Sequence, residues 1–147
     1  MKSRYGLEIR AATAAEAPGL VELLGAAGVV VSARDLAERI EALARGDGTA
    51  LVALEWGPPS GVAVLHWYRT LTAARPVAQI AMLLVGPDAR RRGIGRMLIK
   101  AAAQAARVAG CETLEVLAEA EDLRAFCAAT GFAEAGARFA RGLRKKG

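Results

Sequence analysis

A run of basic residues directly in front of two closely spaced glycines is the part of this sequence best suited to chemistry. The run reads RRRGIG, from Arg90 to Gly95. An apolar segment precedes it and apolar residues at helical spacing follow it, so the glycines lie where a strand ends and a helix begins. The first backbone N–H groups of a helix are unpaired, and the helix dipole adds positive charge beside them. The junction therefore favours a bound phosphate group.

The glycines and the arginines of the junction both suit such a ligand. A side chain at Gly93 or Gly95 would keep the backbone away from a bulky anion, and guanidinium groups would add charge around it. A solvated arginine run beside a tight turn has the same letters, so the pattern alone leaves both interpretations open. A Walker loop is excluded because Lys and Ser/Thr do not follow the glycine, and a dinucleotide fingerprint is excluded by the bulk of Leu98. The arginines are Arg90, Arg91, Arg92 and Arg96.

The elements that must position this junction alternate between short strands and helices. Apolar patterns predict strands at 7–12, 49–55, 61–69, 77–85 and 113–118, with one or two more in 132–143. Helices are predicted after capping signals at Thr13 and Ser32, from Gly93 to Gly110, and over 121–130. Segment 77–85 is almost entirely apolar, which is typical of a strand covered on both faces. The predicted buried face of the third helix consists of Ile94, Met97, Leu98, Ala101, Ala105 and Val108.

Composition indicates a single globular domain over residues 1–147. Of the 147 residues 54% are hydrophobic and 24% charged, which is enough to build one core. The net charge of +5 favours an anionic ligand, but arginine used for solubility gives the same balance. No segment resembles a signal peptide or a membrane span, so we expect a cytoplasmic protein without a membrane partner. Cys111 and Cys127 lack metal-ligand spacing, which predicts reduced thiols and no metal site.

The stretch around the junction resembles one protein family. RRRGIG matches the R/Q-x-x-G-x-G/A signature of the GNAT superfamily of acetyl-CoA-dependent N-acetyltransferases, which also lies between an apolar strand and an amphipathic helix. The stretch LEVLAEAEDLRAFCAATGF, from Leu114 to Phe132, resembles the family's next strand, helix and closing Gly-Phe. The resemblance implies an α/β (α+β) fold. Its mixed, mostly antiparallel sheet would be flanked by helices, with a splayed fourth and fifth strand.

The resemblance also implies acetyl-CoA as co-substrate, without a metal. In the family the free end of the fourth strand pairs with the pantetheine arm, and the pyrophosphate lies on main-chain amides of the following loop. The N–H of Leu84 or Val85 is then the expected donor to the thioester carbonyl. The residues implied to bind acetyl-CoA are Leu83, Leu84, Val85, Arg90, Arg91, Arg92, Gly93, Ile94, Gly95 and Arg96.

The sequence departs from the family where a base is expected. Many members carry a glutamate on the fourth strand, and this chain has Gln79 there. An amide can position a water but cannot take the amine's proton, and an amide hydrogen-bonded across the sheet is the alternative. His66 is the only imidazole in the chain and a second candidate base. A strand histidine beside two aromatic residues also fits a purely structural role.

A second departure concerns the acid that protonates the leaving thiolate. The family commonly has a tyrosine before the closing Gly-Phe, and this chain has Cys127; Ala120 likewise replaces a frequent asparagine. A thiol is a weaker and shorter donor than a phenol, so Cys127 is either an acid acting through a water or a small buried apolar residue. The catalytic candidates are Cys127, Gln79 and His66.

These residues predict an N-acetyltransferase that moves the acetyl group of acetyl-CoA to a primary amine of a small molecule or peptide. The alternative is a protein that binds acetyl-CoA without transferring the acetyl group, as a sensor or structural partner. Nucleic acid is not expected as a partner, because the basic stretches lack an aromatic stacking surface. The acceptor stays open, although Asp35 and Glu38 could anchor a cationic amine. A monomer or a homodimer is expected.

Overall fold

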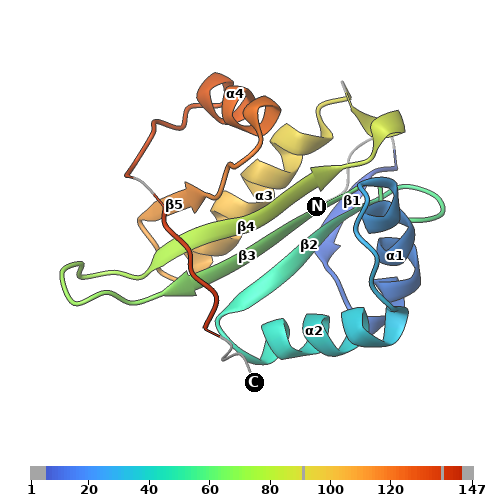
Figure 1. Ribbon diagram of the computed structural model, residues 1–147, viewed down its shortest axis with the longest axis horizontal. Helices are drawn as coiled ribbons and strands as arrows, with labels where there is room; N and C mark the ends of the chain where they lie inside the picture. The colour runs from blue at the N-terminus through green and yellow to red at the C-terminus, as the bar shows by residue number, and fades with distance from the viewer. Residues whose placement is uncertain (1–5, 91, 137, 144–147) are drawn as a thin grey trace. The chain divides into compact units, whose positions relative to one another are not determined.

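The computed structural model describes residues 6–90, 92–136 and 138–143. The chain divides into two compact units, Met1–Leu117 and Ala118–Gly147. The described part of the first unit contains a sheet and three α-helices, and that of the second contains one α-helix (Figure 1). The expectation of a single domain over 1–147 stays a prediction.

A five-stranded sheet in the order β1-β2-β3-β4-β5 forms the centre of the first unit. Its strands are antiparallel to their neighbours except for β4 and β5, which are parallel and joined by a helical crossover. This is the mixed, mostly antiparallel sheet that the family resemblance implied. The strands are β1 (Glu8–Ala11), β2 (Gly48–Leu54), β3 (Gly61–Tyr68), β4 (Val77–Val85) and β5 (Thr113–Val116).

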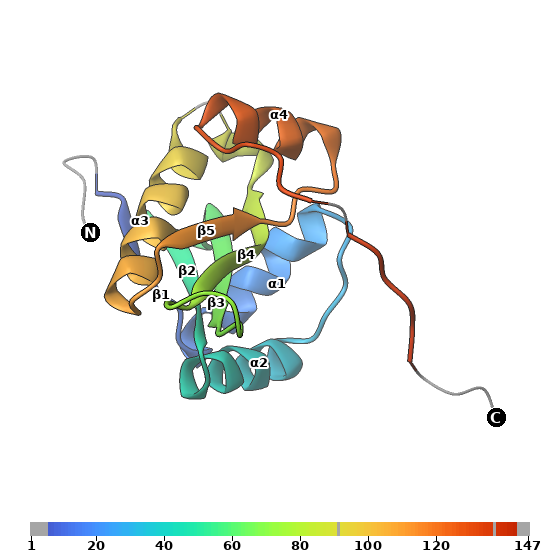
Figure 2. The ribbon, with the colours of Figure 1, turned by 90° about the vertical axis from the view of Figure 1, so that its left-hand side faces the viewer.

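Helices cover both faces of this sheet, as Figures 1 and 2 show. On one face α1 (Ala17–Ala26) and α2 (Ala33–Arg45) bury Leu20 and Ile40 against alternate residues of β2 and β3. On the other face α3 (Ile94–Val108) buries Ile94 and Leu98 in a second apolar cluster. The sheet thus separates two cores, and each core removes from water the apolar faces of the helices that pack against it.

The close approach of α3 to the sheet depends on a glycine in β3. A Cβ atom on Gly61 would lie 2.9 Å from Cδ1 of Leu98 and 3.2 Å from the carbonyl oxygen of Leu84. Leu98 is fully buried, so its side chain has no free space into which to move. Only glycine therefore allows the helix to pack at this distance.

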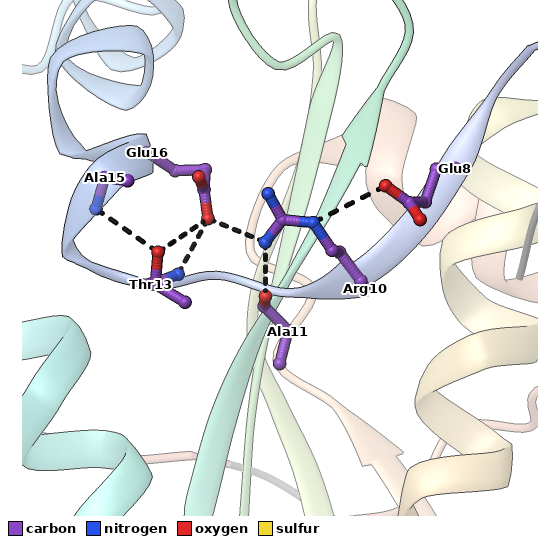
Figure 3. Close-up of polar contacts among 6 residues, drawn as sticks. All are labelled: Glu8, Arg10, Ala11, Thr13, Ala15 and Glu16. Carbon is purple, nitrogen blue, oxygen red and sulfur yellow. Dashed lines mark hydrogen bonds and ion pairs between the residues drawn. The ribbon is translucent and has the colours of Figure 1, made fainter.

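The first helical segment begins with a capping box, shown in Figure 3. Thr13 precedes the short 3-10 turn Ala14–Glu16 that leads into α1, and its hydroxyl oxygen accepts from the N–H of Ala15. In return Oε1 of Glu16 accepts from the backbone N–H of Thr13 at 2.8 Å and from Nη1 of Arg10 at 2.9 Å. The pKa of Glu16 is lowered, mainly by the hydrogen bond from Arg10. The capping signal read at Thr13 is confirmed.

The start and stop signals of α2 and α3 are confirmed as well. The hydroxyl of Ser32 accepts from the N–H of Asp35 at 3.1 Å and begins α2. At the end of α3, Gly110 has φ +91°, in the left-handed region that glycine tolerates best. The N–H of Cys111 then bonds to the carbonyl of Ala106 and closes the helix at 2.9 Å.

Two predictions of burial are wrong. Val108 is 80% exposed, because the buried stripe of α3 runs through positions four residues apart and ends at Ala106. β4 is not covered on both faces, since Ala81 is exposed and Met82 keeps 37% of its surface exposed. On the Met82 side of the sheet α2 packs against β2, two strands away from β4.

In the second unit, α4 (Glu121–Ala129) confirms the predicted helix. It ends where Gly131 takes φ +96° and the N–H of Phe132 bonds to the carbonyl of Cys127 at 3.0 Å. The strands predicted in 132–143 are absent from residues 132–136 and 138–143, and Ala137 lies outside the described residues. This segment is rich in alanine and glycine, which favour strands poorly, and Phe139 is 94% exposed.

We expect Gly61→Ala to lower the free energy of unfolding by about 1–3 kcal/mol, the usual cost of overpacking a core. Gly25→Ala is the matched control, because a Cβ atom on that helical glycine meets nothing within 4 Å. Gly25→Ala should raise the free energy of unfolding by about 0.5 kcal/mol, because alanine lowers the conformational entropy of the unfolded chain. Urea titration measures both, and effects of the same sign would contradict the packing argument.

We also expect Glu16→Gln to cost stability near neutral pH and to cost less in acid. The variant keeps the capping geometry but removes the charge paired with Arg10. Because folding lowers the pKa of Glu16, its contribution is complete above the unfolded-state pKa, near 4.3, and is lost as pH falls through the folded-state value. Thermal unfolding of wild type and variant from pH 7 to pH 2 measures this. A difference that stays constant with pH would argue against it, and exposed Glu22→Gln is the control.

Candidate functional site

The pairing of β4 with β5 stops halfway along β4. Cα partners run from Val77 opposite Thr113 to Ile80 opposite Val116, and the N–H of Leu117 adds a bond to the carbonyl of Ile80 at 3.0 Å. From Met82 to Val85, β4 pairs with β3 alone, and Ala81 has a register partner on neither strand. Its other edge therefore presents backbone groups without a strand partner among the described residues. The predicted splayed pair is confirmed.

An extra residue in β4 marks the point of the split. Leu65 pairs with Ile80 and Val64 with Met82, so Ala81 has no counterpart on β3 and forms a bulge. Before the bulge Ile80 faces the α3 core, and after it Leu83 faces the same core although it lies three positions later. The bulge thus changes the phase of the strand at the place where β5 departs.

The free half of β4 leads directly to the start of α3. After Val85 the chain passes through Gly86 and the 3-10 turn Pro87–Ala89. Gly93 then takes φ +78° at the N-cap of α3, and no side chain caps the helix. The N–H of Met97 bonds to the carbonyl of Gly93 at 3.1 Å and closes the first turn of the helix. The earlier amides of the first turn point out of the helix end, as helix geometry requires.

The arginines of this junction have different surroundings. Nε of Arg90 lies 3.5 Å from the carbonyl oxygen of Val85. Arg92 donates to both carboxylate oxygens of Glu55, at 2.8 and 2.6 Å, so its side chain reaches the turn after β2. This hydrogen bond lowers the pKa of Glu55 and raises that of Arg92. Arg96 is exposed, and Arg91 lies outside the described residues.

A chain of polar side chains crosses β3, β4 and β5 just before the split. Nε2 of His66 lies 3.2 Å from Oε1 of Gln79, its register partner. Nε2 of Gln79 lies 3.4 Å from Oε1 of Glu115, which is in turn its register partner on β5. The hydroxyl of Tyr68 donates to the same oxygen at 3.0 Å, and this bond raises the pKa of Tyr68. His66, Gln79, Glu115 and Tyr68 are called the cross-strand cluster below.

The structure brings together two of the three predicted catalytic candidates and adds a residue that sequence reasoning missed. Gln79 and His66 meet in the cross-strand cluster, where the amide is hydrogen-bonded across the sheet. Glu115 went unnoticed because nothing in the sequence gives the register of β5 against β4. Alternation along TLEV did place it on a defined face, which is the one signal that could have found it.

Cys127 belongs to the second unit and is 7% exposed. Burial raises the pKa of its thiol, as it does for Cys111. Neither thiol is in a disulfide. Ala120 is the N-cap of α4 and provides no side-chain cap. The role of Cys127 as an acid stays a prediction.

Among the described residues, no group of three or more His, Cys, Asp and Glu side chains is arranged to hold a metal ion. No helix in the same part of the chain is long and apolar enough to cross a membrane.

Comparisons with solved structures agree on the fold. An acetyltransferase from Trypanosoma brucei is 25% identical, with a TM-score of 0.81 over 93% of this chain and 99% of that one. Glucosamine-6-phosphate N-acetyltransferase from Arabidopsis thaliana is 16% identical, with a TM-score of 0.82 over 94% and 99%. An aminoglycoside acetyltransferase from an uncultured soil metagenomic sample, in complex with sisomicin, is 22% identical, with a TM-score of 0.77 over 95% and 97%.

The sequence itself decides the family. No curated protein sequence matches the chain significantly. The family model described as Acetyltransferase (GNAT) family matches residues 18–132, which include the whole junction from β4 to α3 and the cross-strand cluster. The chain belongs to the GNAT family of acetyltransferases.

Proposed function

We propose that this protein transfers the acetyl group of acetyl-CoA to a primary amine. The observation that carries the proposal is the split between β4 and β5, which ends in the uncapped start of α3. A free strand edge can pair with the amide groups of an extended arm, and a helix start can hold the phosphates attached to it. The free strand edge and the helix start follow one another along the chain. The pantetheine arm and the pyrophosphate follow one another in the same way along acetyl-CoA.

The residues at the junction fit this ligand. A Cβ atom on Gly93 would meet nothing within 4 Å, and its φ of +78° disfavours any side chain there, so the surface stays open to an anion. Arg90 and Arg96 are exposed and carry no ion pair among the described residues, which leaves their charge available. Arg92 is held by Glu55 and would contribute its backbone rather than its guanidinium.

Acetyl transfer depends more on how the thioester and the amine are placed than on reactive side chains. Holding the thioester on the free edge of β4 while the amine approaches from the cross-strand cluster would make the reaction effectively unimolecular. An N–H of the unpaired edge, at Leu84 or Val85, would donate to the thioester oxygen as negative charge develops on it. The amine nitrogen bonds to the carbonyl carbon, the carbon–sulfur bond breaks, and the thiolate takes up a proton.

We expect acetyl-CoA to raise the melting temperature, because a ligand that binds only the folded state stabilises it. At a hundred times its Kd the gain is about 2.7 kcal/mol. Gly95→Glu should abolish the shift, since a carboxylate at the helix start would occupy and repel the pyrophosphate. Gln104→Glu is the matched control, because it adds the same charge at an exposed position of the same helix. Differential scanning fluorimetry measures all three proteins, and a shift retained by Gly95→Glu would place the binding surface elsewhere.

Transfer itself is tested by release of the coenzyme thiol from acetyl-CoA in the presence of primary amines. The set should contain an aminoglycoside, glucosamine 6-phosphate, a polyamine and a peptide with a free N-terminus, since the first two are the acceptor classes named for similar folds. We expect at least one amine to accelerate release severalfold and to appear acetylated by mass spectrometry. Binding of acetyl-CoA without release would instead favour a sensor or structural role.

A further inference from the structure

The proposed reaction lacks a proton acceptor on the strand that holds the thioester. Strand β4 reads VAQIAMLLV and contains no acidic side chain. Amines are protonated at neutral pH, with a pKa near 10 for an alkylammonium group, and only the neutral form attacks. A base beside the split of β4 and β5 would supply that form, and a carboxylate is a side chain suited to this role.

Glu115 is the carboxylate that lies there. It is the register partner of Gln79 on β5, one pair before the last pair of the two strands. Gln79 is two residues before Ala81, which corresponds to about 7 Å along an extended strand. Glu115 is partly buried, and in the described part of the chain no Lys or Arg lies within ion-pair distance of it.

The cross-strand cluster holds one oxygen of this carboxylate and leaves the other available. Oε1 accepts from the hydroxyl of Tyr68 and from Nε2 of Gln79. Gln79 cannot turn its amide around without losing a partner, because its own oxygen would then face Oε1 of Glu115, which only accepts. Oε2 of Glu115 receives no hydrogen bond from the described residues. A carboxylate with one fixed oxygen and one free oxygen is suited to accept a proton from a ligand.

We propose that Glu115 is the general base of the reaction and that Gln79 and Tyr68 are its positioning residues. The inference rests on the proposed acetyl transfer. Oε2 takes a proton from the acceptor's ammonium group, directly or through one water. The neutral nitrogen then bonds to the thioester carbon, the carbon–sulfur bond breaks and the thiolate is protonated. Glu115 returns its proton to solvent, so that an ammonium and a thioester become an amide, a thiol and a released proton.

Few other titratable groups of the first unit face this carboxylate. On β3 they are Tyr68, which donates to it, and His66, which reaches it only through Gln79. On β4 the register partner is the neutral Gln79. Arg75 and Glu112, near the start of β5, pair with each other at 3.1 Å and are mostly exposed. In the described part of the first unit, no other carboxylate and no Lys or Arg pairs with Glu115.

The test compares wild type with Glu115→Gln, using acetyl-CoA and the fastest amine of the set described above. We expect kcat at pH 7 to fall by about a hundredfold or more, the usual range for loss of a general base. The melting-temperature shift with acetyl-CoA should be unchanged. The deficit should shrink severalfold toward pH 10, because the amine then loses its proton to solvent. Glu112→Gln is the matched control, since it removes the same charge three residues away, and it should keep the wild-type rate.

An exchange of side chains separates chemistry from folding. Glu115→Gln combined with Gln79→Glu places the carboxylate on β4 and the amide on β5, and keeps one hydrogen bond between them. We expect the double variant to recover at least tenfold of the lost rate, because a carboxylate again lies at this register pair beside the split. A folded double variant without recovery would argue against a base at this pair.

The possible results are distinct. Wild type that shows no shift with acetyl-CoA overturns the proposed function and this inference with it. Wild type that binds acetyl-CoA but acetylates no amine overturns the assignment of a base. A folded Glu115→Gln protein with a rate near wild type at pH 7, or a deficit that stays constant up to pH 10, overturns the role of Glu115 while leaving acetyl transfer intact.

Discussion

The parallel pairing of β4 with β5 ends after four register pairs, and the other functional features depend on that ending. Were the ladder to continue, the edge from Ala81 to Val85 would be occupied by another strand and closed to any ligand. The bulge at Ala81 bends β4 at this point, as an unpaired residue in one strand does. The same bend directs the chain through Gly86 to the start of α3, so the strand edge and the helix start meet.

The placement of α3 is the second condition for this arrangement. Its start is held by Ile94 and Leu98, which are almost fully buried under the sheet, and by the absence of a side chain at Gly61. A helix fixed in this way presents its first amides in one direction without any capping side chain. Binding through main-chain groups then depends on the fold rather than on particular residues.

Local signals in the sequence predicted most of the fold. The hydroxyl groups of Thr13 and Ser32 begin helical segments where their spacing indicated, because a cap depends only on residues three positions apart. The junction at Arg90 to Gly95 is equally local. The segment after Phe132 has no such signal. Its alanines and glycines have little preference for a strand, so its conformation depends on tertiary contacts that the sequence does not reveal.

The candidate site could be predicted only in part, since half of it depends on register. Gln79 and Glu115 are 36 residues apart, and a shift of one position in β5 would place Glu115 on the opposite face of the sheet. The bulge at Ala81 likewise changes which face of the sheet the later residues of β4 occupy, because the alternation of faces at every second residue is interrupted there. The position of Glu115 beside Gln79 therefore depends on how the strands align in space, which local patterns do not predict.

The ion pair between Arg92 and Glu55 links the proposed acetyl-CoA surface to a segment that lies outside it. Arg92 stands in the turn before α3, and Glu55 directly follows β2, where it begins the turn toward β3. A ligand that moves the turn of Arg92 away from Glu55 would break this pair. If that ligand and a partner at the turn after β2 both alter the pair, each changes the affinity for the other by the same factor. Trp56, which follows Glu55 and is exposed, lies next to this link between the two turns.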